Sequence, residues 1–198
     1  MLLALAGAVV PMAIAAPSGT AAPKGCSANS SPRMGRLTIK SLKIVNKPIR
    51  TRDNECSLSY GPVWDINFPA RPGDGQVMVI DAHDVTGVAG YDTHGAHGPF
   101  YHLYLVKRGY MVKIRSDGWL RWYRFVGAPK PYRQCDYVLV KGKKGKVRKC
   151  YPHNAPIKPI VRHGHKVETL YLRCCWPRYT HDEFLTAKAV LVKSKRVR

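Results

Sequence analysis

The sequence predicts a mainly β protein, folded as a barrel or a sandwich, and three observations support this. Short apolar or alternating runs recur from residue 36 onwards, and Gly, Pro, Asp and Asn separate them. Several runs alternate strictly, as residues 111–115 (Met-Val-Lys-Ile-Arg) do, and a period of two is typical of antiparallel strands. The number of such runs favours a barrel or a sandwich.

The expected strands follow one another with turn signals between them. Ser116, Asp117 and Gly118 predict a hairpin turn between two strands. A short helix is expected only within residues 99–105. The clearest strand candidates are residues 37–39, 48–51, 76–80, 110–115, 119–126, 169–174 and 185–192.

Residues 127–166 interrupt this rhythm with five prolines, two cysteines and a basic run at 141–149. A segment of this length without a strand pattern is usually functional or disordered. We therefore expect a long basic loop before the strand that begins near residue 169.

The composition is that of a globular domain with an unusual charge. Apolar residues make up 45% of the 198 residues and aromatic residues 10%, which excludes wholesale disorder. Thirty-three Lys and Arg against 12 Asp and Glu give a net charge of +21. This charge implies attraction to polyanions, such as nucleic acid, anionic lipid or acidic wall polymers. No helix-turn-helix, zinc-finger or RNP pattern is present, so specific nucleic-acid binding is not expected.

The N-terminal residues predict export. Residues 1–16 carry no charged side chain and end in small residues, but are short for a membrane span. They are interpreted as a signal peptide, with a short membrane anchor as the alternative. Residues 17–35 read as a flexible linker, which leaves residues 36–198 as one domain. The protein is then secreted or held at the outer face of the cell membrane.

Six cysteines in an exported chain permit disulfides, although the sequence does not give their connectivity. The pairs worth testing are Cys26 with Cys56 and Cys135 with Cys150, because each would tether a segment that looks irregular.

Two segments carry groups suited to nucleophilic catalysis. An apolar run ends in His83, and a second run ends in Cys174 and Cys175. A thiolate needs a nearby cation, a histidine can supply the leaving-group proton, and an arginine can bind the carbonyl where negative charge develops. The alternatives are a structural histidine and a disulfide-bonded cysteine. Asp81 and Asp84 flank His83 and are candidates to orient it.

From residue 36 to 192 the chain resembles the sortases, the cysteine transpeptidases of bacterial cell surfaces. Residues 36–44 resemble the opening strand of that family, and residues 71–83 resemble the segment bearing its histidine. The further matches are residues 98–103 to G-x-F-x-x-L, 106–110 to L-K-x-G-D, 171–175 to T-L-x-T-C and 175–179 to C-T-P-R-Y.

The resemblance implies a closed β-barrel of about eight strands with one or two short helices. It implies Cys175 as the nucleophile and His83 as the acid, and no metal or organic cofactor. Leu172, Cys174 and Trp176 are the expected substrate-binding residues. The expected partners are a sorting-signal peptide of LPxTG type and an amine acceptor, either a wall precursor or a pilin-type lysine.

The chain also departs from the family pattern. Tyr171 and Cys174 replace both threonines of T-L-x-T-C, and Phe184 stands where the family arginine is expected. Arg178 is the preferred substitute for that arginine, and the equal alternative is that Arg178 only shapes the turn. Alternation places Cys174 on the opposite face from Cys175, as a small core thiol. A competing hypothesis is a catalytically impaired basic domain that binds anionic wall polymer or nucleic acid.

Overall fold

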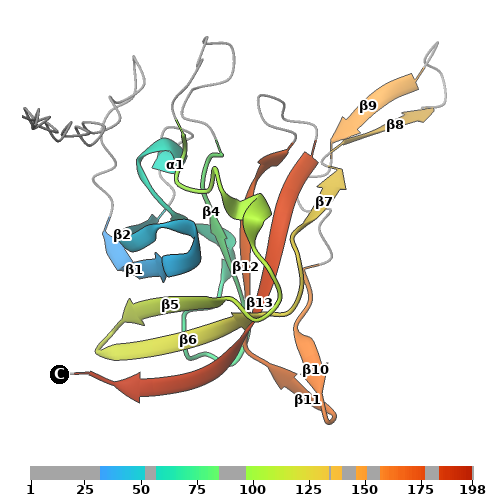
Figure 1. Cartoon of the computed structure of the whole chain (residues 1–198). Helices are drawn as coiled ribbons and strands as arrows, with labels where there is room; N and C mark the ends of the chain where they lie inside the picture. Colours follow the sequence, from blue (N-terminus) through green and yellow to red (C-terminus); the bar gives the residue numbers. More distant parts are fainter. Residues whose placement is uncertain are drawn as a thin grey trace, which may run out of the picture.

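The computed structural model describes residues 32–51, 57–84, 97–133, 135–139, 146–150, 157–176 and 183–197. Its body is a closed β-barrel of eight strands (Figure 1). Around the barrel the order is β12-β4-β3-β2-β1-β5-β6-β13, and pairing of β13 with β12 closes it. The strands are β1 (Arg33–Ile39), β2 (Ile44–Thr51), β3 (Val63–Pro69), β4 (Val77–Asp81), β5 (Met111–Ser116), β6 (Trp119–Phe125), β12 (Thr169–Trp176) and β13 (Glu183–Arg196).

The barrel is mixed. Two of its pairs, β2 with β3 and β4 with β12, are parallel, and the others are antiparallel. Because parallel neighbours run in the same direction, β4 and β12 end at the same rim of the barrel. A further strand, β7 (Lys130–Arg133), pairs with the first part of β13 outside this ring.

The core fills the inside of the barrel with side chains from alternate strand positions. On β12 the inward residues are Leu170, Leu172 and Cys174, and each is no more than 3% exposed. Burying a Leu or Val side chain in this way stabilises the fold by about 1.5–3 kcal/mol. Other fully buried members of the core are Leu37, Ile39, Ile49, Met78, Ile80, Phe100, Leu103, Val112, Ile114, Tyr123, Ala187 and Ala189.

The structure confirms the mainly β fold class and each of the seven strand candidates. Residues 127–166 differ from the expected loop, because besides β7 they contain two hairpins. These are β8 (Cys135–Leu139) with β9 (Lys146–Cys150), and β10 (Ile160–Arg162) with β11 (His165–Val167). His163 and Gly164 both have positive φ and join the second hairpin as a two-residue turn. Prolines and lysines around these short strands hide their apolar pattern in the sequence.

The β8–β9 hairpin places two cysteines in register. Cys135 is the Cα partner of Cys150, so the backbone brings the two residues of one expected disulfide opposite each other. The disulfide itself stays a prediction, and Cys26 and Cys56 lie outside the described residues.

Helical structure in the described residues is confined to short segments: η1 (Lys40–Leu42), α1 (Ser57–Tyr60) and η2 (Leu103–Leu105). Only the last of these lies within the helix expected at residues 99–105. None of the described helices is long and apolar enough to span a membrane. The expected leader at residues 1–16, and residues 17–31 of the expected linker, lie outside the described residues, whereas residues 33–35 of that linker form the start of β1.

A buried carboxylate fixes the turn that leads into β4. Glu168, just before β12, accepts hydrogen bonds from the backbone N–H groups of Gly73 and Gly75 at 3.0 Å and from the Tyr123 hydroxyl at 2.5 Å. Burial, and then the charge of Glu168 and the hydrogen bond to it, raises the pKa of Tyr123 above its usual value. This network ties the starts of β4 and β12 together, which sets how far each strand reaches at the other rim.

Candidate active site

The parallel pairing of β4 and β12 determines where the two candidate catalytic residues emerge. Asp81 is the register partner of Arg173, and the next N–H along, that of Ala82, donates to the Arg173 carbonyl at 3.1 Å. His83 and Cys175 each follow this pair by two residues. The backbone therefore brings His83 and Cys175 to the same rim of the barrel, at the ends of adjacent strands.

The two adjacent cysteines point to opposite faces of β12. Cys174 is 3% exposed and belongs to the core cluster, as expected for a small core thiol. Cys175 is partly exposed and shares its face with Arg173, because residues two apart on a strand point the same way. Both residues carry thiols rather than forming a vicinal disulfide.

His83 is held by main-chain hydrogen bonds on both of its sides. Its N–H donates to the Leu58 carbonyl at 3.2 Å, and its carbonyl accepts from the Phe100 N–H at 3.0 Å. The following residue, Asp84, accepts from the Gly98 N–H at 2.8 Å. His83 is 4% exposed, so segments far away in the sequence fix its position.

Gly98 makes the closest approach to this histidine. A Cβ atom on Gly98 would lie 2.3 Å from the His83 carbonyl oxygen and 2.7 Å from its carbonyl carbon. No side chain fits there without moving the backbone of His83. This close approach explains why the motif at residues 98–103 begins with glycine.

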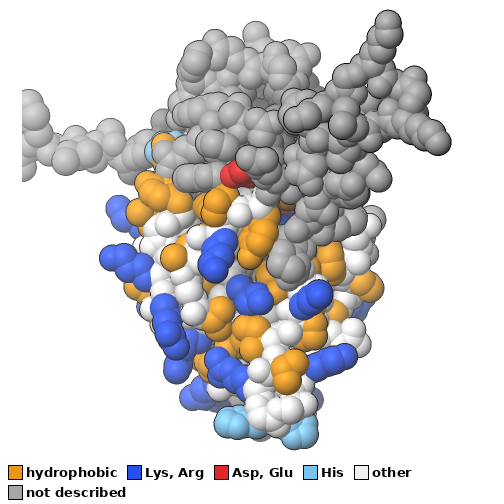
Figure 2. Space-filling model, turned by 90° about the vertical axis from the view of Figure 1, so that its right-hand side faces the viewer, with side chains coloured by type: hydrophobic (Ala, Val, Ile, Leu, Met, Phe, Trp, Pro, Cys, Tyr) orange, Lys and Arg blue, Asp and Glu red, His pale blue; other side chains and the backbone are white. Residues whose placement is uncertain are grey.

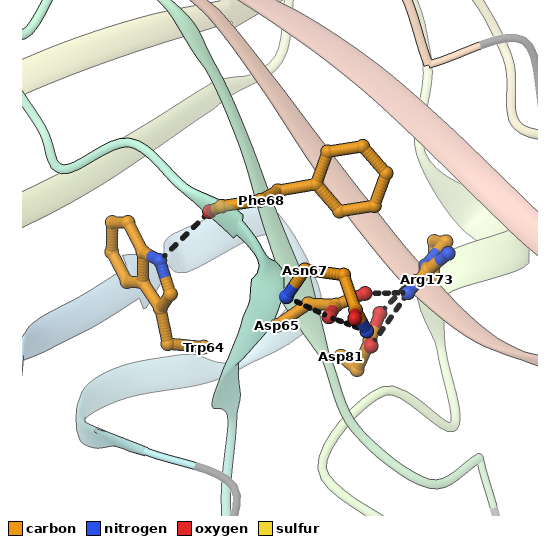
Figure 3. Close-up of polar contacts among 6 residues, drawn as sticks. All are labelled: Trp64, Asp65, Asn67, Phe68, Asp81 and Arg173. Carbon is orange, nitrogen blue, oxygen red and sulfur yellow. Dashed lines mark hydrogen bonds and ion pairs between the residues drawn. The ribbon is translucent and has the colours of Figure 1, made fainter. Parts of the chain in front are cut away.

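Arg173, Asp81 and Asp65 form a buried ion cluster (Figure 3), and Arg173 and Asp81 precede Cys175 and His83 by two residues each. Arg173 on β12 binds Asp81 on β4 through Nε–Oδ1 and Nη2–Oδ2 contacts, both of 2.7 Å. Its Nη2 also donates to Oδ2 of Asp65 on β3 at 2.5 Å. The other oxygen of Asp65 accepts from the backbone and side-chain nitrogens of Asn67 at 2.9 and 2.8 Å. One guanidinium thus connects three neighbouring strands.

Two aspartates surround one arginine in this cluster. Burial acts to lower the pKa of the Arg173 guanidinium, but the hydrogen bond and charge of Asp81, followed by the charge of Asp65, outweigh it and raise that pKa. The guanidinium therefore stays protonated throughout the physiological pH range.

On its other side the candidate site faces β13. Phe184 is the register partner of Cys175, so an aromatic ring stands opposite the candidate nucleophile, where the resemblance implies an arginine. The Arg173 guanidinium carbon lies 5.0 Å from the centroid of this ring, within cation–π range. The next pair along is Arg173 with Thr186, and the one after it is Tyr171 with Lys188.

The other predicted site residues are distributed differently. Leu172 and Cys174 are buried in the core of the barrel, and their contact with substrate stays a prediction. Trp176 ends β12 opposite Glu183. Arg178 lies outside the described residues.

Sequence reasoning missed Arg173. The signal for it was present, because an arginine between Leu172 and Cys174 is a charged residue within an otherwise apolar strand. Asp81 breaks the apolar run of β4 in the same way. Arg173 and Asp81 are oppositely charged residues in otherwise apolar strands, and such residues predict a buried ion pair once the two strands are known to be neighbours.

On the described surface the basic side chains are scattered rather than gathered in one patch. Figure 2 shows Lys and Arg side chains spread among hydrophobic ones over the described part of one face, with little Asp or Glu. Lys113 and Lys193 lie 5.9 and 5.3 Å from the ring of Trp122. Among the described residues, no group of three or more His, Cys, Asp and Glu is arranged to hold a metal ion.

The chain has the fold of the sortases. Sortase C-1 from Actinomyces oris superposes with a TM-score of 0.58 at 17% identity, covering 83% of this chain and 76% of that one. Sortase E from Streptomyces avermitilis gives 0.57 at 18% identity, covering 83% and 90%. Sortase A from Corynebacterium diphtheriae gives 0.58 at 19% identity, covering 82% and 62%. No protein-family model and no curated protein matches the sequence.

Proposed function

We propose that this protein is a sortase-like cysteine transpeptidase that acts on a sorting-signal peptide of LPxTG type at the cell surface. The observation that supports this most directly is the parallel pairing of β4 and β12, which brings His83 and Cys175 to one rim. The sortase fold of the barrel agrees with this chemistry.

The reaction needs a thiolate, an acid and an incoming amine. The Cys175 thiolate attacks the scissile carbonyl carbon, the C–N bond breaks, and the His83 imidazolium gives its proton to the leaving amine. An acceptor amine then attacks the thioester, a C–N bond forms, the C–S bond breaks, and His83 takes up the proton. The acceptor is the amine of a wall precursor or a pilin-type lysine. By resemblance an arginine binds the carbonyl oxygen, and Arg178 is the candidate from the sequence.

The decisive experiment is capture of the acyl-enzyme. Purified protein is incubated with an LPxTG-type peptide and analysed by intact-mass spectrometry, with hydroxylamine added as an acceptor amine in a parallel sample. We expect an adduct at Cys175 that hydroxylamine discharges as a peptide hydroxamate. Cys175→Ala should form no adduct, whereas Cys174→Ala should still form one because Cys174 faces the core.

A second candidate function is binding without catalysis. The net charge of +21 and the aromatic residue opposite Cys175 favour a basic β-domain that adheres to anionic wall polymer, a membrane surface or nucleic acid. If no sorting peptide acylates the wild-type protein, and binding to teichoic-acid-like polyphosphate is tight, this function replaces the first one.

Export is proposed with either function. Residues 1–16 have the features of a signal peptide or a short anchor. Expression of the full chain in a bacterial host, with N-terminal sequencing of the mature protein, tests whether this leader is cleaved.

A further inference from the structure

Two buried polar groups beside Cys175 have hydrogen-bonding capacity that none of the described residues uses. A guanidinium has five N–H donors, and Arg173 gives three of them to Asp81 and Asp65. Within the described part of the chain, Nη1 of Arg173 and Oγ1 of Thr186 are buried and make no hydrogen bond. The Arg173 side chain is 4% exposed, so this donor is kept out of bulk water.

The two groups face each other across one pair of strands. Arg173 on β12 and Thr186 on β13 are register partners, so their side chains lie on the same face of the barrel wall. The neighbouring pair on that face is Cys175 with Phe184. Residues two apart on a strand are separated by about 6.6 Å, a distance that an arginine side chain spans.

The aspartates and the phenylalanine ring fix the orientation of the guanidinium. The edge formed by Nε and Nη2 is directed at Asp81, so Nη1 lies on the opposite edge of the plane. The Phe184 ring lies 5.0 Å from the guanidinium carbon. Held on these two sides, the group cannot rotate to satisfy Nη1 elsewhere.

We propose that Nη1 of Arg173, together with Oγ1 of Thr186, binds the carbonyl oxygen of the peptide that Cys175 attacks. This inference rests on the proposed transpeptidase function and names the group that stabilises its oxyanion. When the thiolate adds to the carbonyl carbon, negative charge develops on that oxygen, and donors already fixed in a water-poor site stabilise it most. Phe184 then serves as the platform that holds the guanidinium, and no arginine is needed at its position.

The role requires the fork of arginine and not only its charge. In Arg173→Lys the ammonium still neutralises Asp81 and Asp65, but the second donor edge is lost. We expect Arg173→Lys to fold and to form the acyl-enzyme roughly 10²–10³-fold more slowly. Thr186→Val, which removes only the hydroxyl, should slow acylation by up to about tenfold. Lys188→Gln, two residues further along β13, is the control and should acylate at the wild-type rate.

A rescue experiment separates binding of the substrate from support of the fold. In Arg173→Lys/Phe184→Arg a guanidinium returns from β13, directly opposite Cys175. We expect this double variant to acylate at least tenfold faster than Arg173→Lys alone. A purely structural role of Arg173 predicts that Phe184→Arg changes the acylation rate by the same factor with and without Arg173→Lys, whereas the proposal predicts a gain only together with Arg173→Lys.

A measurement on the wild-type protein does not depend on the folding of any variant. ¹⁵N-labelled arginine side chains are observed by NMR before and after Cys175 is alkylated by a peptide chloromethyl ketone that mimics the sorting signal, a reaction that forms a thioether and releases chloride. We expect the Nη resonances assigned to Arg173 to shift when the adduct forms. The inference is overturned if they stay unchanged, or if folded Arg173→Lys acylates within threefold of wild type.

The outcomes keep the inference distinct from the function on which it rests. An active wild-type protein whose rate falls with Arg178→Ala and not with Arg173→Lys assigns the oxyanion donor to Arg178 and refutes the inference alone. A wild-type protein that forms no acyl-enzyme with any sorting peptide refutes the proposed function, and the inference with it.

Discussion

Substituting Gly98 by alanine should inactivate the protein through a single methyl group that touches no substrate. The new Cβ would lie 2.3 Å from the His83 carbonyl oxygen and 2.9 Å from the Asp84 carbonyl carbon. Ordinary van der Waals contact begins at 3.4 Å, so the backbone of His83 must retreat by about 1 Å. These neighbours are main-chain atoms, which cannot swing aside as the end of a side chain does.

The expected loss follows from that displacement. A misplacement of about 1 Å at a catalytic group lowers kcat by about 100-fold, and the overpacked contact destabilises the fold by about 1–3 kcal/mol. The acyl-enzyme assay gives the rate, and urea unfolding followed by tryptophan fluorescence gives the free energy of unfolding.

Gly127→Ala is the matched control for this prediction. A Cβ at Gly127 meets no heavy atom within 4 Å, so the same chemical change has room there. We expect wild-type acylation and stability from this variant. If Gly98→Ala keeps the wild-type rate and stability, then Gly98 does not constrain His83, and the packing described for this corner of the barrel is wrong.

Three further predictions concern other parts of the molecule. In urea unfolding, the free energy of unfolding of the wild type should fall above pH 10 more steeply than that of Tyr123→Phe, by up to about 1.4 kcal/mol per pH unit. The reason is that the raised pKa keeps Tyr123 protonated in the folded protein, whereas Tyr123 ionises in the unfolded chain. Equal slopes for the two proteins would contradict this. Cys175 should react with iodoacetamide at least 100-fold faster than Cys174, whose labelling requires the core to open. Peptide mapping distinguishes the two thiols. Comparable rates would refute the orientation of β12, in which Cys174 points into the core and Cys175 points away from it. Binding to polyphosphate should weaken steeply between 50 and 300 mM salt with no sequence preference among nucleic acids, as follows from scattered charge, and salt-independent, sequence-selective binding would show otherwise.

The sequence was most informative where a strand is buried on one face. The alternation of residues 111–115 predicted β5, and the apolar runs ending at His83 and Cys175 predicted β4 and β12. It was least informative for short hairpins such as β10–β11, whose strands of three residues are stabilised by main-chain pairing and leave little apolar pattern.

Only some residues of the candidate site could be predicted from the sequence. Cys175 and His83 stood out because their residue types are chemically distinctive and each follows an apolar run. Arg173 did not, because its meaning depends on Asp81 and Asp65, which lie 92 and 108 residues away along the chain. A buried charge is interpretable only when its partner is known, and that partner is determined by strand pairing rather than by local pattern.

The closure of the barrel has a consequence for how the protein acquires its site over time. The strands that carry His83 and Cys175 are neighbours in space, yet the ion pair that joins them spans 92 residues of chain. Contacts of such sequence separation form late, since the entropy of closing a long loop must be overcome before they contribute stability. During synthesis His83 therefore emerges before its catalytic partner exists. Cys175 becomes its neighbour only when the last two barrel strands, β12 and β13, have been made and can pair. Folding should then be slow, with acylation activity and barrel formation appearing together in one final kinetic phase.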